Sequence, residues 1–183
     1  MTHHPDRSSR QRLAVEPLSA VEFAPFGDLL CNDGPLRRRV YHDATQEGEG
    51  PGELLFSVSH VKPLETTPVL ITQLERHPYS AQTFVPLKVS RWLVVVAPAL
   101  PDGSPDATRI RAFLAAPGQG ISYRQGTWHQ GTTVLDTDAQ FAVLMWRRTA
   151  NDDNELYDLR EPIEIDIANC SINGDESRKR EDP

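Results

Sequence analysis

The stretch from Gln73 to Lys88, QLERHPYSAQTFVPLK, carries the densest set of reactive side chains in this sequence. Glu75 and His77 lie two residues apart in it. Residues i and i+2 of a β-strand point to the same face, so both side chains can enter one cavity. A second stretch, GQGISYRQGTWH at 118–129, follows further along the chain and ends in His129. We expect a glycine-bearing hairpin there to bring His129 to Glu75 and His77 inside a closed sheet.

Short strand patterns separated by Pro and Gly turns fill most of the chain. RWLVVVA at 91–97 is the strongest buried-strand pattern, because it is rich in β-branched residues. LLFSVSHVK at 54–62 and IEIDI at 163–167 alternate as half-buried strands do. We expect one short helix at 20–24, after a capping-box serine, and a helical turn within 151–160. No βαβ rhythm is present, so the pattern predicts an all-β sandwich or barrel.

The composition favours a single folded domain with polar ends. The chain has 183 residues, of which 38% are hydrophobic and 25% are charged. We expect a disordered N-terminal tail at 1–12, one domain at 13–168 and a polar C-terminal tail at 169–183. The N-terminal segment lacks the apolar stretch that a secretory signal requires.

The charge and the cysteines narrow the expected partners. The formal net charge is -7 and the chain has no long Lys/Arg stripe, so neither nucleic acid nor an anionic membrane is an expected partner. The longest apolar run, Trp92 to Ala97, is far too short to span a bilayer. Cys31 and Cys170 have no CxxC spacing, which is typical of a reducing cytosol. We therefore expect a cytoplasmic protein that binds a small molecule.

The reactive side chains of the two stretches are donors of the kind that bind borderline divalent metals. The spacing resembles the motifs of the cupin barrel, whose first motif is His-x-His followed by Glu. Here the corresponding positions are Glu75, His77 and Gln82. In the second cupin motif most marked positions agree, including His129, whereas Arg124 replaces a proline. Two interpretations stay open: a divalent metal (nickel, manganese or zinc) held by Glu75, His77, Gln82 and His129, or a metal-free acid/base site.

Longer phrases carry a closer resemblance. LERHPYSAQTFVPL, LVVVAP, RAFLA and GQGISYRQGTWH, with the earlier YHD, resemble the ureidoglycolate lyase (ureidoglycolate hydrolase) family of allantoin breakdown. The likeness covers roughly residues 13 to 150. It implies a cupin-like β-barrel (double-stranded β-helix, or jelly roll) with a few short helices, usually as a homodimer. It also implies a carbon–nitrogen lyase of purine degradation that cleaves (S)-ureidoglycolate to glyoxylate and urea.

The chemistry of that reaction suits these residue types. One carbon of ureidoglycolate bears a hydroxyl, a carboxylate and a urea nitrogen. Cleavage needs a base for the hydroxyl proton, an acid or a Lewis acid to help urea leave, and a cation for the carboxylate. We expect His77 and His129 to transfer protons or to bind metal together with Glu75, and Arg111 to be the carboxylate clamp. The other expected substrate-binding residues are Gln82, Tyr123, Trp128 and His42.

Several of these residues also have a purely structural interpretation. Glu75 can form an ion pair with Arg76 at a strand end. His77 precedes Pro78, which favours an extended backbone, so it can be a turn residue. Trp128 can belong to the core.

The chain departs from the family pattern directly after His129. The family usually has Trp-His-His-Pro, and here Gln130 and Gly131 replace the second histidine and the proline. If the lost histidine binds metal or transfers a proton, the substrate differs. Two alternatives follow: a paralogue that acts on another small carbinolamide or keto acid, and a non-catalytic module that binds a small acid.

Overall fold

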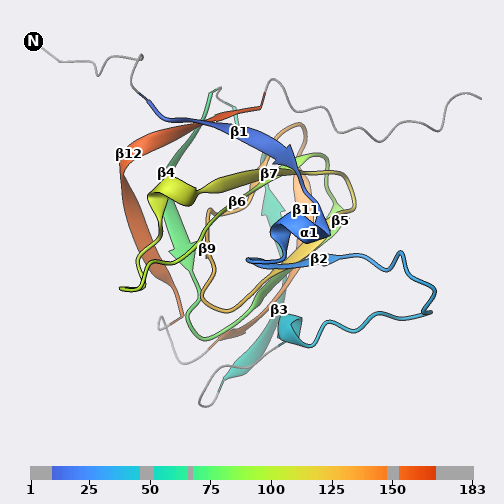
Figure 1. Ribbon diagram of the computed structural model, residues 1–183. Helices are drawn as coiled ribbons and strands as arrows, with labels where there is room; N and C mark the ends of the chain where they lie inside the picture. The colour runs from blue at the N-terminus through green and yellow to red at the C-terminus, as the bar shows by residue number, and fades with distance from the viewer. Residues whose placement is uncertain (1–9, 46–51, 66–67, 148–152, 168–183) are drawn as a thin grey trace, which may run out of the picture.

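Strands make up nearly all of the regular structure in the computed structural model, which describes residues 10–45, 52–65, 68–147 and 153–167 (Figure 1). The larger sheet contains, in spatial order, β10 (Thr133–Val134), β6 (Trp92–Ala97), β7 (Arg111–Ala115), β1 (Arg12–Pro17), β12 (Glu155–Asp166), β4 (Val69–Arg76) and β9 (Trp128–His129). The smaller sheet contains β2 (Gly27–Leu30), β8 (Gly120–Tyr123), β5 (Gln82–Lys88), β11 (Ala139–Arg147) and β3 (Glu53–Val61). The helical elements are α1 (Ala20–Phe23), η2 (Asp43–Thr45) and η3 (Ala107–Arg109).

The larger sheet closes on itself, because β9 pairs with β4 on one side and with β6 on the other. His129 lies at this closure, opposite Glu75 of β4 and opposite Val96 of β6. The strands β6, β7, β1, β12, β4 and β9 therefore form a ring, which can be followed in Figure 1. One apolar core fills this ring and includes Ile71, Leu74, Val95, Ala112, Leu114, Trp128, Ile163 and Ile165. The closed barrel and the scarcity of helix confirm the predicted all-β, cupin-like fold.

A second core lies between the ring and the smaller sheet. Its buried members include Phe23, Phe26, Phe84, Trp92, Val94, Val96, Phe113, Tyr123 and Phe141. Strand β6 belongs to both cores, because its alternate side chains point to opposite faces. Burial on both faces explains why this strand reads as a continuous apolar run. The two faces of β7 are divided in the same way, with Ala112 and Leu114 in the ring core and Phe113 in the second core.

The chain enters the smaller sheet through the predicted short helix. Ser19 caps α1, since its hydroxyl accepts a hydrogen bond from the backbone N–H of Glu22 at 3.3 Å. The helix buries Phe23 completely in the second core. Gly27 then begins β2 very close to β8, where a Cβ atom would lie 2.0 Å from the carbonyl oxygen of Ser122. Only glycine allows this approach of the two strands.

The predicted helical turn at 151–160 is wrong for the residues that the structure describes, because 155–166 form the long strand β12. Apolar side chains at Tyr157, Leu159, Ile163 and Ile165 face the ring core. These four positions keep one phase of alternation along β12, whereas the register of β12 with β4 changes between Asp158 and Ile163. Pro162 lies in this irregularity, a position where its missing N–H costs no ladder hydrogen bond. Residues 151 and 152 lie outside the described residues.

The expected tails lie mostly outside the described residues. Strand β1 begins at Arg12, while 1–9 and 168–183, including Cys170, are not described. The domain limits therefore stay a prediction. Within the described ranges, none of the helices has the length and apolar character needed to cross a bilayer.

Trp92 ties the two sheets together and provides a test of the second core. Its side chain is 1% exposed, packs edge-on against Phe141 with ring centroids 5.0 Å apart, and donates from Nε1 to the carbonyl oxygen of Gln119. We predict that Trp92→Ala lowers the free energy of unfolding in urea by about 3–5 kcal/mol, because it leaves a large cavity. The control Val21→Ala changes a side chain that is 81% exposed, and we expect less than about 0.5 kcal/mol. Equal losses in the two variants would contradict this account of the core.

Candidate active site

The two reactive stretches meet at the closure of the ring. Glu75 comes from β4, His77 follows the end of β4, and His129 comes from β9; one ligand atom from each lies within 4.8 Å of the others. Nε2 of His129 is 3.6 Å from Oε1 of Glu75, and the two imidazole centroids are 5.4 Å apart. The Arg76 guanidinium instead pairs with Glu155 across the sheet. The structure thus brings Glu75, His77 and His129 together, as the sequence predicted.

His77 is fixed by contacts with two distant segments. Its Nδ1 lies within hydrogen-bond distance of the carbonyl oxygen of Asp153, and its own carbonyl oxygen accepts from the N–H of Gly126 at 2.8 Å. The Asp153 carboxylate accepts from the backbone N–H of Tyr79 at 2.8 Å and from the hydroxyl of Ser80 at 2.6 Å. Gly126 has φ 75°, in the left-handed region that favours glycine. These bonds hold the turn after β4 against the hairpin that carries His129.

His129 is fixed by its ring on one side and its backbone on the other. Its Nδ1 is 2.9 Å from the carbonyl oxygen of Thr127, which can only accept, so Nδ1 carries the proton. The imidazole stacks on the Tyr123 ring, with centroids 4.1 Å apart and an interplanar angle of 19°. Nε2 then points toward Oε1 of Gln82, 3.1 Å away, and toward Glu75. Tyr123 and Gln82 therefore belong to the site.

Burial keeps the imidazole of His129 and the phenol of Tyr123 uncharged. Burial, with a smaller contribution from the neighbouring His77, lowers the pKa of His129 to about 3, so its imidazole is neutral at physiological pH. Burial raises the pKa of Tyr123 well above its usual value, and the charge on Glu75 raises it further. The phenol of Tyr123 therefore stays protonated. The cluster thus presents the neutral imidazole of His129 beside the side chains of His77 and Glu75.

This donor set fits a divalent metal. Both histidines bind a backbone carbonyl through Nδ1, which is the arrangement that orients metal-ligating imidazoles in proteins. Nε2 of His77 is buried and has no hydrogen-bond partner among the described residues. Nε2 of His129 faces the carbonyl oxygen of Gln82, so two acceptors oppose each other. A cation between these atoms and Glu75 would satisfy all of them.

A cavity opens beside the cluster. It has a volume of about 300 Å³, the lower end of the range usual for small-molecule sites. His77 belongs both to the cluster and to the wall of this cavity. The lining residues are Leu55, His77, Met145, Arg147, Asp153 and Asn154.

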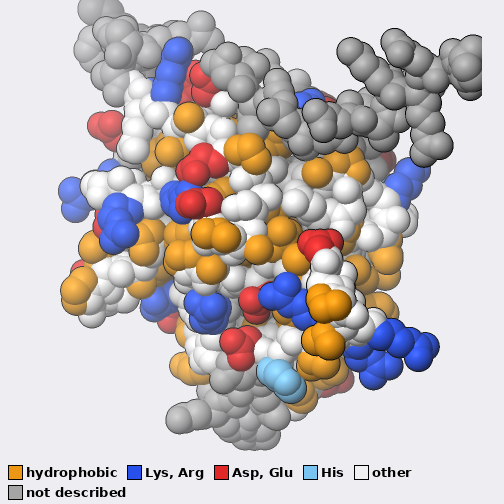
Figure 2. Space-filling model, turned by 45° about the vertical axis from the view of Figure 1, so that its right-hand side comes forward, with side chains coloured by type: hydrophobic (Ala, Val, Ile, Leu, Met, Phe, Trp, Pro, Cys, Tyr) orange, Lys and Arg blue, Asp and Glu red, His pale blue; other side chains and the backbone are white. Residues whose placement is uncertain are grey.

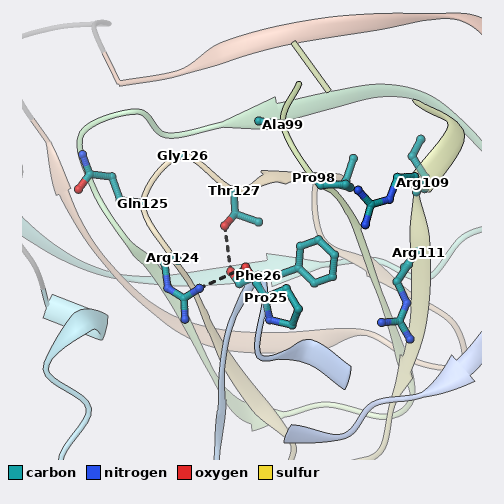
Figure 3. Close-up of a pocket in the computed structure, with 12 residues that line it drawn as sticks. Pro25, Phe26, Pro98, Ala99, Arg109, Arg111, Arg124, Gln125, Gly126 and Thr127 are labelled. Atoms are coloured by element: carbon teal, nitrogen blue, oxygen red, sulfur yellow. Dashed lines mark hydrogen bonds between the residues drawn. The ribbon is translucent and has the colours of Figure 1, made fainter. Parts of the chain in front are cut away.

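The structure places Arg111 in a different and larger cavity, of about 550 Å³, together with Arg109 and Arg124 (Figure 3). Its guanidinium already has two carboxylate partners, Glu16 at 2.5 Å and Glu22 at 2.7 Å. These hydrogen bonds raise the pKa of Arg111, chiefly through Glu16. The role of Arg111 as a carboxylate clamp stays a prediction.

Two further predicted residues do not join the cluster. Trp128 is buried in the ring core, where its Nε1 donates to the carbonyl oxygen of Gly103 and the Arg76 guanidinium lies 4.7 Å above its ring. Because adjacent strand residues point to opposite faces, Trp128 and His129 look in opposite directions. His42 is exposed, in the segment between β2 and η2. Its role in substrate binding stays a prediction.

The sequence analysis missed three polar residues that line the smaller cavity, Arg147, Asp153 and Asn154. Asp153 and Asn154 lie beyond the stretch that carries the family resemblance. No local pattern marks them, because their place depends on the pairing of β11 and β12 with strands far away in the sequence.

The fold and the site define a cupin-like barrel with a histidine–carboxylate centre, and comparisons with known proteins identify the family. Residues 10–166 match the family model described as ureidoglycolate lyase. The ureidoglycolate lyase of Burkholderia cepacia is 41% identical over 143 residues, covering 72% of this chain and 78% of that protein. That of Burkholderia mallei is 37% identical over 142 residues, covering 72% and 81%. The chain belongs to the ureidoglycolate lyase family.

A distant likeness to solved structures also exists. RmlC from Streptococcus suis aligns with a TM-score of 0.41 and 15% identity, covering 55% of this chain and 47% of that chain. At this level the likeness says nothing about activity.

Proposed function

We propose that the protein is an enzyme that cleaves (S)-ureidoglycolate to glyoxylate and urea at the cluster of Glu75, His77 and His129. The observation that carries the proposal is the convergence of two imidazoles and a carboxyl group beside a small cavity. Membership of the ureidoglycolate lyase family supports the choice of substrate.

The reaction moves one proton and breaks one bond. The hydroxyl of ureidoglycolate loses its proton as the carbonyl of glyoxylate forms, the carbon–nitrogen bond breaks, and the urea nitrogen gains a proton. No water is consumed, so the enzyme acts as a lyase. His77 lines the cavity, where it can contact a bound substrate. A carboxylate oxygen of Glu75 can accept the proton of the substrate hydroxyl, and the proton then passes to the urea nitrogen.

We further propose that Glu75, His77 and His129 hold a divalent cation, with Gln82 as a fourth ligand. Nickel, manganese and zinc all suit such a mixed oxygen and nitrogen donor set. When bound, the cation supplies Lewis-acid polarisation of a substrate oxygen. Neutral imidazoles are the form of histidine that binds metal, and the low pKa of His129 favours that form.

The replacement of the second family histidine by Gln130 leaves this cluster intact. The backbone N–H of Gln130 donates to the carbonyl oxygen of Val95, so residue 130 continues the ladder of β9. Adjacent residues of a strand point to opposite faces, so a side chain at 130 is directed away from the face of His129. This favours ureidoglycolate over a different substrate.

We propose that two chains associate through the outer face of the smaller sheet. β3 is an edge strand, paired only with β11 among the described strands, and its alternate residues Leu54, Phe56 and Val58 are exposed. Phe56 alone is 67% exposed. Val85 and Leu87 add exposed apolar surface on β5 of the same sheet. An exposed apolar edge strand is a surface that natural proteins usually cover.

We propose that the protein resides in the cytoplasm and that its partner there is a small acid. Charged side chains of both signs are interspersed with hydrophobic ones on the face shown in Figure 2, which offers no continuous basic stripe to a nucleic acid. Cys31 is a free thiol, in keeping with a reducing compartment. Fractionation of cells should find the protein with a cytoplasmic marker, and recovery with a membrane marker would contradict this.

Glyoxylate release tests the activity and the metal together. We predict release from ureidoglycolate by the purified protein, loss after chelation, and recovery with nickel, manganese or zinc. His77→Ala and His129→Ala should each lower kcat/KM at least about 100-fold. The control is His60→Ala, which changes an exposed histidine of β3 that contacts Asp138. This variant should keep the activity of the wild type.

Each result decides one part of this proposal. Activity that ignores the chelator but disappears in both histidine variants would replace the metal with a metal-free acid/base site. No glyoxylate release under any condition would contradict the proposed reaction.

The association of two chains has its own test. We predict that light scattering coupled to size-exclusion chromatography gives the mass of two chains for the wild type. Phe56→Glu should give the mass of one chain, because it buries a charge in the proposed interface. An unchanged mass in Phe56→Glu would place the interface elsewhere.

A further inference from the structure

Arg147 is a guanidinium that opens onto the catalytic cavity and has no assigned role. It is the last residue of β11 and lines the cavity together with His77. Its side chain is exposed, so a ligand that enters the cavity can reach it.

The register of β11 directs Arg147 toward the cluster. Met145 lies two residues before it and therefore on the same face of the strand. Sδ of Met145 accepts a hydrogen bond from Nε2 of Gln82 at 3.7 Å, and Gln82 in turn faces His129. The face of β11 that carries Met145 and Arg147 is thus the face that looks onto the site.

Among the described residues, no carboxylate forms an ion pair with Arg147, although Glu53 lies directly opposite it in the register of β3. The acid on the cavity wall, Asp153, already accepts from Tyr79 and Ser80. Arg111 differs, because Glu16 and Glu22 hold it. Within the described part of the chain, the cavity therefore offers a guanidinium without a carboxylate partner to an incoming anion.

We propose that Arg147 binds the carboxylate of the substrate and so selects 2-hydroxy acids over neutral carbinolamides. The identity of that acid as ureidoglycolate rests on the proposed function. A guanidinium donates two parallel hydrogen bonds to a carboxylate, which fixes both position and orientation. With its carboxylate at Arg147, the substrate presents its reacting carbon toward His77, on the same cavity wall. Arg147 takes the role that the sequence assigned to Arg111.

Kinetics of charge-matched variants test this proposal. The substrate carboxylate keeps its charge throughout the reaction, so its partner contributes equally to the ground state and the transition state. Arg147→Gln should therefore raise KM about 10- to 100-fold and leave kcat within a few-fold. Arg147→Lys should show a smaller rise in KM than Arg147→Gln, because lysine restores the positive charge but not the two parallel hydrogen bonds of the guanidinium. Arg109→Gln is the control, since it removes the same charge from an exposed residue of the other cavity.

Binding of sodium glyoxylate, measured by calorimetry, separates this proposal from the proposed function. Arg147→Gln should raise the Kd for glyoxylate by a factor similar to that for KM, with thermal unfolding unchanged from the Arg109→Gln control. If wild-type protein releases no glyoxylate from ureidoglycolate, the proposed reaction is wrong. The effect of Arg147→Gln on the Kd for glyoxylate then decides by itself whether Arg147 binds a carboxylate. The proposal would be overturned if KM and Kd stay unchanged in Arg147→Gln, or if KM and Kd rise in Arg111→Gln only.

Discussion

The pairing of β9 with both β4 and β6 is the constraint on which the rest of the structure depends. This two-residue strand closes the ring and sets its two side chains on opposite sides. Trp128 points into the ring core, where Gly103 and Arg76 hold it. His129 is thereby forced to the other side, opposite Glu75. The packing of one core and the chemistry of the site thus depend on the same short strand.

The chemistry of the site follows from what burial does to its polar groups. A carbonyl oxygen beside Nδ1 fixes the tautomer of each histidine, so both Nε2 atoms offer lone pairs to the same space. Burial keeps the His129 imidazole neutral, and Gln82 adds a further acceptor. Acceptors that converge without a donor repel one another, so the arrangement is compatible with a cation between them.

The sequence alone was sufficient for features that repeat locally or carry a motif. The apolar run of β6, the cap of α1 and the meeting of Glu75 and His77 with His129 all followed from periodicity and spacing. Features set by long-range pairing could not be predicted in this way. Alternation at 163–167 correctly indicated a strand, but the helical turn predicted within 151–160 was wrong, because residues 155–158 pair with β4 in a register that changes before Ile163. The place of Arg147 depends on the register of β11 with β5, which no local pattern encodes.

The most direct test of the central claim is the position of a metal ion in crystals of the protein grown with manganese. Anomalous diffraction locates manganese without reference to activity or to substrate. The account predicts one strong peak per chain, bonded to Nε2 of His77, Nε2 of His129 and an oxygen of Glu75. A cluster in which these three atoms bind only water or each other, with no peak between them, would contradict it.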